Sequence, residues 1–204
     1  MVSDKRALAT KPIQRSRNLP FQRKSAKPRA FLDEPALYDY ALASLGRRMR
    51  TVSELQRLLR AQVEPGEHGQ AIIDRTLARL REYRFLDDQA FADNYTQLRQ
   101  QNEKHGARRV RQDLAIKGVP SDVITQAVEA RYAEVSEEAL AREHLERKRI
   151  RKPENEKETA RIMRRLVTAG FSPTVIYKIL RQWSIPDETL AILETLDDEP
   201  APED

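Results

Sequence analysis

Apolar residues recur every three or four positions through most of the chain, with polar residues between them. This spacing puts the apolar side chains on one face of a helix, and no stretch alternates with period two for long enough to suggest a sheet. The pattern therefore predicts an all-α protein. The apolar faces indicate helices at residues 37–45, 55–59, 73–80, 91–98, 107–114, 124–128, 140–145, 162–167 and 175–183.

The helical pattern repeats with a shift of 52 residues, as a comparison of VRQDLAIKGVPSDVITQAV with MRRLVTAGFSPTVIYKIL shows. Gly118 falls on Gly170, and each supplies the left-handed residue that ends a helix. The apolar residue that follows each glycine is expected to pack back onto the helix just ended. The other aligned pairs are Leu114 with Leu166, Val119 with Phe171, Ile124 with Ile176 and Val128 with Leu180.

Polar residues at the expected helix starts predict N-caps. Thr51 followed by Glu54 forms a capping box, and Ser172 before Pro173 matches an N-cap followed by a first helical residue. Ser121 is predicted to take the same capping part after Pro120. The first repeat fits more loosely, through Leu59 and Ile73, if its loop VEPGEHG carries about four extra residues.

These signals predict three tandem three-helix modules that form an elongated, curved array, at residues 35–86, 87–134 and 135–185. Each module is too small to bury much surface alone, so neighbours must pack on each other. Residues 1–34 are predicted to be a disordered basic tail and residues 186–204 an acidic tail. The N-terminal prediction rests on four prolines that interrupt any helix, at Pro12, Pro20, Pro28 and Pro35.

The charge is uneven along the chain. Residues 1–35 carry about +6, residues 186–204 carry eight acids and no base, and the body between them carries about +7. A basic body favours an anionic partner, although a solvated surface without a specific partner explains the same charge. The chain has no Cys, no run of membrane-span length and no apolar leader segment, so we expect a cytoplasmic protein without disulfides or thiolate metal sites.

Catalytic groups are sparse. Asp87 and Asp88 are the best acidic pair, but adjacent side chains diverge on a helix, and capping together with a favourable helix dipole explains them better than a metal site. His105 is predicted to have a turn or capping role and His144 to pack in the core. His68, His105 and His144 show no metal-ligand spacing, so we predict no cofactor, no metal and no enzyme activity.

Basic residues gather in the second and third modules. On the helix that includes residues 162–167, one stripe of Lys157, Arg161, Arg164 and Arg165 lies opposite the apolar face. That face is Ile162, Met163, Leu166 and Val167. The helix at 140–145 is expected to end in the run RKRIRK. An ordinary solvated face is the alternative for any single helix. The candidate partner- or DNA-binding residues are Arg108, Arg109, Arg111, Lys117, Arg147, Lys148, Arg149, Arg151, Lys152, Lys157, Arg161, Arg164 and Arg165.

The middle of the chain resembles the signature of the RecX regulatory proteins of bacteria. FLDDQAFADNYTQLR is followed by GARRVRQDLAIKGVP and an Ile-x-x-Ala-Val helix, and the resemblance extends over roughly residues 35–183. It is dense in the second module, clear in the third and looser in the first. The residues at family spacing are Phe85, Asp87, Asp88, Phe91, Ala92, Tyr95, Arg99, Gly106, Arg109, Leu114, Lys117 and Gly118.

The resemblance implies a regulator and not an enzyme. Proteins of this family bind the RecA recombinase filament in its helical groove, and they limit its growth, ATP hydrolysis, strand exchange and stimulation of repressor self-cleavage in the SOS response. It implies RecA as partner, and we expect a monomer that does not bind membranes. The basic body keeps open a direct DNA- or RNA-binding helical protein, with single- or double-stranded DNA as partner. A hydrolase or nuclease using Asp87 and Asp88 is the least favoured hypothesis.

Overall fold

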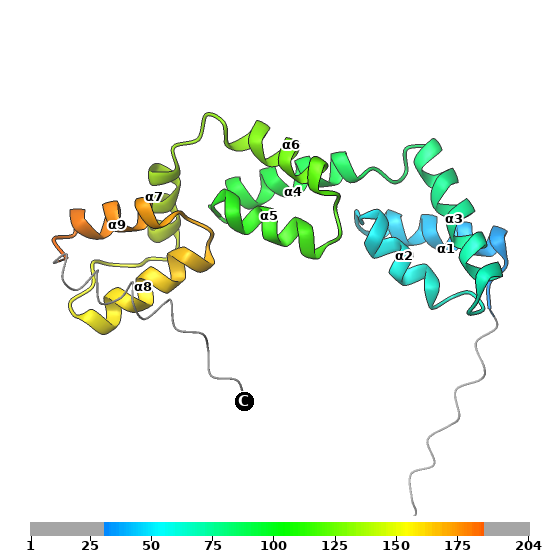
Figure 1. The fold of residues 1–204 in the computed structure, drawn as a ribbon, viewed down its shortest axis with the longest axis horizontal. Helices are drawn as coiled ribbons and strands as arrows, with labels where there is room; N and C mark the ends of the chain where they lie inside the picture. Colours follow the sequence, from blue (N-terminus) through cyan, green and yellow to red (C-terminus); the bar gives the residue numbers. More distant parts are fainter. Residues whose placement is uncertain (1–30, 186–204) are drawn as a thin grey trace, which may run out of the picture. The chain divides into compact units, whose positions relative to one another are not determined.

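The computed structural model describes residues 31–185, and in that range it contains helices and no strand, which confirms the all-α prediction. The predicted tails at residues 1–30 and 186–204 lie outside the described residues. Among the described residues, no helix is both long and apolar enough to cross a membrane. The helices are α1 (Glu34–Arg47), α2 (Val52–Arg60), α3 (Glu67–Glu82), α4 (Asp88–Gln101), α5 (Ala107–Ile116), α6 (Ser121–Tyr132), α7 (Glu137–Arg147), α8 (Glu156–Thr168) and α9 (Pro173–Gln182) (Figure 1).

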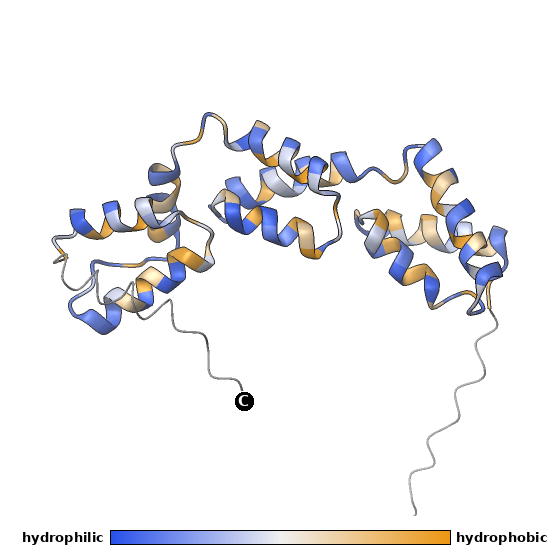
Figure 2. Cartoon of the chain, viewed as in Figure 1, coloured by the Kyte–Doolittle hydropathy of each residue, from blue (hydrophilic) through white to orange (hydrophobic). Residues whose placement is uncertain are grey.

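The buried apolar side chains form three clusters, each enclosed by three consecutive helices. We call these helix groups the first triplet (α1–α3), the second triplet (α4–α6) and the third triplet (α7–α9). Figure 2 shows apolar residues on one side of most helices, as amphipathic helices require. Burial of one large aliphatic side chain stabilises the fold by roughly 1.5–3 kcal/mol. The boundaries of the three modules as folding units stay a prediction.

The two glycine stops occur where the repeat places them. Gly118 has φ 74° and Gly170 has φ 91°, both in the left-handed region that disfavours other residues. The next residue turns back in each case, because Val119 N donates to Leu114 O at 3.1 Å and Phe171 N donates to Leu166 O at 3.2 Å. All ten residues of the five aligned pairs except the two glycines belong to the buried core, so the repeat is confirmed at the level of packing.

Helix starts agree with the sequence in part. Thr51 caps α2, because its Oγ1 accepts from Glu54 N at 3.0 Å. Ser172 is the N-cap residue of α9, but its hydroxyl donates to Glu137 Oε2 at 2.8 Å and does not cap the helix. The reason is tertiary: the Glu137 carboxylate also accepts from Ser172 N at 2.6 Å, so it holds both polar groups of the serine.

The prediction that Ser121 caps a helix is wrong. Ser121 is the first residue of α6, and Pro120 occupies the N-cap position with φ −58° and ψ 145°. Proline fixes the extended backbone that an N-cap needs, so the helix begins one residue after it. Pro35 also departs from the prediction, because it lies in the first turn of α1, where a missing N–H breaks no helical bond. Asp33 caps that helix through Ala36 N at 3.0 Å.

Two residues assigned to apolar helix faces are exposed instead. Leu98 is 56% exposed and Val167 is 44% exposed. The fully buried residues of α4 are Ala92 and Thr96, and Leu98 points well away from both around the helix. The buried stripe of α8 includes Thr159, a polar residue that binds the carbonyl of Asn155 through its hydroxyl at 3.0 Å. Each stripe is therefore rotated toward a buried threonine that apolar periodicity alone does not reveal.

Successive triplets are joined at equivalent backbone positions. Lys117 O accepts from the hydroxyl of Thr51 at 2.7 Å, and Ala169 O accepts from Gly106 N at 2.9 Å. Lys117 and Ala169 are the residues immediately before the two glycine stops, 52 positions apart. Thr51 and Gly106 are the N-cap residues of α2 and α5. Each glycine stop thus contacts the start of the middle helix in the preceding triplet.

Candidate functional site

The two adjacent aspartates bind the starts of two different helices. Asp87 caps α4 as predicted, because its Oδ1 accepts from Ala90 N at 2.9 Å. Asp88 Oδ1 accepts from Val52 N at 2.9 Å, so its carboxylate interacts with the start of α2 in the preceding triplet. Burial raises the pKa of Asp88 above its ordinary value, against the lowering effect of the Val52 hydrogen bond. The arrangement fits helix capping and joining of the triplets, with each carboxylate already bound to a backbone N–H.

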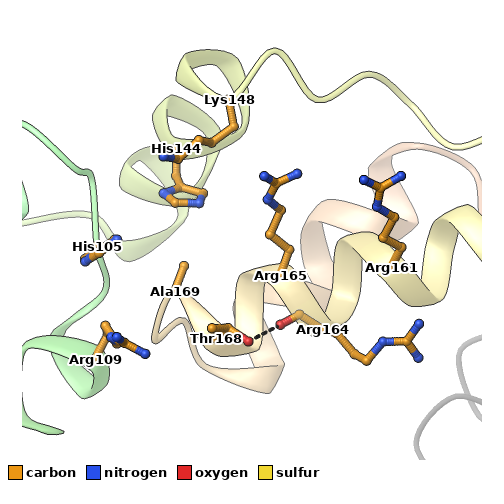
Figure 3. Close-up of a pocket in the computed structure, with 9 residues that line it drawn as sticks. All are labelled: His105, Arg109, His144, Lys148, Arg161, Arg164, Arg165, Thr168 and Ala169. Atoms are coloured by element: carbon orange, nitrogen blue, oxygen red, sulfur yellow. Dashed lines mark hydrogen bonds between the residues drawn. The ribbon is translucent and has the colours of Figure 1, made fainter. Parts of the chain in front are cut away.

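A hollow of about 530 Å³ lies where the second and third triplets meet. Of the described residues, five cationic side chains and no carboxylate line it, and they come from α5, the end of α7, and α8. We call it the basic hollow. Its lining residues are His105, Arg109, His144, Lys148, Arg161, Arg164, Arg165, Thr168 and Ala169 (Figure 3).

Helical spacing on α8 supplies three of these cations. Figure 3 shows Arg161 and Arg165, four residues apart, extending from α8 toward the side on which Lys148 lies. Within the described part of the chain, no acidic side chain lies within 4.0 Å of the guanidinium groups of Arg161, Arg164 or Arg165. Cations brought together without acidic partners repel one another, and a bound anion relieves that repulsion.

The other two cations of the basic hollow have acidic neighbours. Arg109 Nε lies 3.0 Å from Asp113 Oδ1, one turn further along α5. Lys148 Nζ lies 4.0 Å from Glu103 Oε2 of the second triplet. Both pairs are partly exposed, so solvent and salt screen them and their contribution to stability is small. The two cations nearest the junction therefore have acidic partners, whereas those on α8 have none among the described residues.

A second hollow of about 410 Å³ adjoins the first and shares Lys148, Arg161 and Arg165 with it. Its other cations belong to the run RKRIRK, of which only Arg147 lies in α7. The prediction that this run ends a helix is therefore wrong beyond Arg147. Arg149 adopts φ 53°, a left-handed conformation that stops the helix. The cations that the loop adds are Arg149, Arg151 and Lys152, beside the acidic Glu154 and Glu158.

We call the two adjoining hollows together the basic surface. Eight of the thirteen candidate basic residues line it, although they come from two triplets and from both helices and a loop. Arg108, Arg111, Arg147 and Lys157 are exposed elsewhere. Lys117 lies at the other junction, where its Nζ is 2.9 Å from Glu54 Oε1 and 5.6 Å from the Tyr95 ring centroid. The roles of all thirteen residues stay a prediction.

Two histidines form part of the basic hollow that sequence reasoning did not bring together. The rings of His105 and His144 lie 5.9 Å apart between centroids, although the residues are 39 positions apart in the chain. His144 is buried as predicted, with its Nδ1 3.1 Å from Glu103 O and its ring edge against Phe171. Burial lowers the pKa of both imidazoles, and His144 lowers that of His105 further. No periodicity or spacing signal connects the two residues.

Comparison with known proteins shows which family this chain resembles. Residues 87–128 match a family model described as the second three-helix domain of RecX. The chain is similar to the regulatory protein RecX of Leptothrix cholodnii, at 32% identity over 69% of this chain and 85% of that protein. It is also similar to the regulatory protein RecX of Myxococcus xanthus, at 31% identity over 71% of this chain and 83% of that protein. The regulatory protein RecX of Geobacillus kaustophilus is 33% identical over 70% of this chain. The chain spans about half the length of that relative.

Two crystal structures of RecX proteins share the fold. The structure from Lactobacillus salivarius has a TM-score of 0.56 and 19% identity, over 74% of this chain and 96% of that one. A second RecX structure has a TM-score of 0.59 and 23% identity, over 73% of this chain and 71% of that one. Tandem three-helix groups define the class as helical repeat proteins. Within that class, the chain belongs to the RecX family of regulatory proteins.

Proposed function

We propose that this protein is a non-enzymatic regulator that binds RecA filaments and limits their extension, ATP hydrolysis, strand exchange and SOS co-protease activity. The observation that carries the proposal is membership of the RecX family, with relatives matched over most of their length. The best acidic pair supports a role without catalysis, because Asp87 and Asp88 are engaged by backbone N–H groups.

The basic surface is the region we propose for contact with the filament or with the DNA inside it. A RecA–DNA filament presents carboxylates and phosphates, and uncompensated arginines are suited to bind either group. Arg161, Arg164 and Arg165 have exposed side chains on a well-buried helix, so their charges can be changed without opening the core. This separation between the binding face and the packing face makes the proposal testable by substitution.

The test is ATP hydrolysis by RecA on single-stranded DNA, measured with sub-stoichiometric amounts of the purified protein. We expect the wild-type chain to lower the rate and the Arg161→Glu/Arg165→Glu variant to have a much weaker effect. A matched control reverses two exposed cations of the first triplet, Arg57→Glu/Arg60→Glu, and should keep the wild-type effect. If the wild-type chain changes neither hydrolysis nor filament length, the proposed function is wrong.

A second candidate function is direct binding of nucleic acid, with effects on RecA as a consequence. The observation that favours it is the lining of the basic hollow, with five cations and no carboxylate among the described residues. Binding that depends on several phosphate contacts should weaken by about tenfold or more between 50 and 200 mM salt. Nanomolar binding to DNA at physiological salt, in the absence of RecA, would favour this candidate over the first. No detectable binding would exclude it.

A further inference from the structure

The described chain ends beside the basic surface. Trp183 and Ile185 pack against the third cluster, as does Ile150 of the loop after α7. A small hollow of about 310 Å³ is lined by Ile150 and Lys152 of that loop together with Gln182 and Trp183 at the end of α9. Ile150 and Lys152 also line the second hollow of the basic surface. Residue 185, the last described residue, therefore packs on the same cluster as the loop after α7, whose Lys152 lines the basic surface.

The segment that follows residue 185 is opposite in charge to the basic surface. Residues 186–204 contain eight acidic residues and no basic one. A flexible chain of this length has a root-mean-square span of roughly 22–26 Å, while the α8 arginines Arg161 and Arg165 are separated by only about 6 Å along the helix. The tether is thus long enough to cover the neighbouring surface and short enough to give an effective concentration on the order of millimolar.

Three carboxylates of α7 have partners other than the arginines of α8, and Glu154 and Glu158, which line the second hollow, form no ion pair with those arginines within 4.0 Å. Glu138 binds Lys178 and Arg142, and Glu143 Oε2 lies 2.6 Å from Lys104 Nζ. Glu137 holds Ser172 at the start of α9. These three carboxylates of α7 therefore join helices and triplets. The arginines of α8 are left without acidic partners among the described residues.

We propose that the acidic segment at residues 186–204 binds the basic surface and competes there with anionic partners. The segment acts as an electrostatic pseudo-ligand: its carboxylates pair with the cations of α8 and of the loop after α7, and a polyanion must displace it. The inference rests on the basic surface of the proposed function, but it does not depend on RecA. Because the attraction is between exposed charges, it should be screened by salt.

Binding of the acidic segment to the basic surface can be measured with a spin label at residue 204. The chain has no cysteine, so Asp204→Cys provides a single attachment site. We expect the label to broaden the backbone NMR signals of residues 148–152 and 161–165 at 50 mM salt, without RecA or DNA. The matched control carries the same label on a segment in which its other Asp and Glu residues are replaced by Asn and Gln. Equal broadening with the acidic and the neutral segment would overturn the proposal.

Competition is measured by binding of a fluorescent dT20 oligonucleotide. The neutral-segment variant should bind about tenfold more tightly than wild type at 50 mM salt, and the difference should shrink as salt rises. The Arg161→Glu/Arg165→Glu substitution should remove most of that difference. Tighter binding without a loss of label-induced broadening would mean long-range repulsion only, and it would also overturn the proposal. Absence of an effect on RecA ATP hydrolysis would contradict the proposed function and leave the broadening result unaffected.

Discussion

Two junctions join the triplets: the first lies between the first and second triplets, and the second lies between the second and third. Both place a carbonyl acceptor at the same position of the repeat, but the groups around it differ in chemistry. In both, the carbonyl before a glycine stop accepts a hydrogen bond from an N-cap residue of the preceding triplet. The first junction surrounds this bond with side chains, through the Glu54–Lys117 pair and the bond from Val52 N to Asp88. At the second junction the backbones themselves approach, and a Cβ on Gly106 would lie 2.3 Å from Gly170 O.

This difference shows what the repeat preserves and what it leaves free. The glycine stop and the carbonyl before it are kept, since they follow from a local helix-ending motif. The donor that meets the carbonyl varies between a threonine hydroxyl and a glycine N–H. The first junction should therefore be sensitive to loss of polar groups, and the second to the addition of even one methyl group.

The largest expected loss of stability comes from substitution of the buried leucine four residues before each glycine stop. Leu114 and Leu166 are fully buried, and their carbonyls hold the residues that follow the glycines. Substitution of either by alanine should destabilise the fold by roughly 2–5 kcal/mol. Urea denaturation followed by circular dichroism measures the loss, and the fluorescence of Trp183, the single tryptophan, reports on the third triplet. A loss below 1 kcal/mol would show that the stops do not depend on this packing.

The glycine stops should differ from each other when changed to alanine. Both variants carry the cost of a left-handed non-glycine residue, of order 1–3 kcal/mol. The added Cβ of Gly170→Ala lies 2.3 Å from the backbone N and 2.9 Å from the Cα of Arg109, whereas that of Gly118→Ala meets only side-chain atoms, 2.4 Å from the Oγ and 2.5 Å from the Cβ of Ser53, and of these the Oγ can turn away. We therefore expect Gly170→Ala to cost about 1 kcal/mol or more beyond Gly118→Ala in the same assay.

A helical glycine serves as the control for this pair. Gly46 lies in α1, and a Cβ added there would meet nothing within 4 Å. Gly46→Ala should leave stability unchanged or raise it by roughly 0.5–1 kcal/mol. Equal losses for Gly118→Ala and Gly170→Ala would contradict the contrast between the two junctions.

At the first junction, Thr51→Val should destabilise by about 1–2 kcal/mol. Threonine and valine have nearly the same shape, but the valine neither donates to Lys117 O nor accepts from Glu54 N, and the site is fully buried. Thr51→Ser keeps both hydrogen bonds and is the matched control. If Thr51→Val and Thr51→Ser have the same midpoint in urea, the hydroxyl does not stabilise the junction.

The smallest expected effect is a pH dependence of stability that arises at the second junction. The pKa values of His105 and His144 are lowered in the folded state, chiefly by burial, while the unfolded chain titrates near 6.5. The unfolded state therefore binds more protons, so stability present above pH 6.5 is lost as the pH falls below it. Urea midpoints from Trp183 fluorescence at pH 7.5 and 5.5 should show this loss. It should shrink in His105→Gln and persist in the exposed control His68→Gln.

Much of the fold could be predicted because its signals are local. Apolar periodicity located every described helix, and the glycine stops followed from residues within one turn. One error arose where a distant residue decides the outcome, because Ser172 binds Glu137, which lies 35 positions earlier. Others are local: Pro120 and not Ser121 is the N-cap of α6, and the buried stripes of α4 and α8 include threonines that apolar periodicity does not count.

The candidate site could be predicted only in pieces. The spacing of Arg161 and Arg165 on one helix is visible in the sequence. Their position beside Arg109 and Lys148 depends on how the second and third triplets meet, which rests on the bond from Gly106 N to Ala169 O. The histidine pair depends on the same junction. Sequence therefore identified the charges but not the surface they share.

The junctions join two unlike patches, the end of one helix and the start of another, so they are head-to-tail and not related by a two-fold axis. A heterologous contact of this kind leaves one patch of each sort unused, and it can be repeated without closing. The start of the last middle helix, at Asn155, is the patch equivalent to Thr51 and Gly106. A duplicated three-helix unit could therefore be added by the same carbonyl contact, which gives the fold a simple route to growth by tandem duplication.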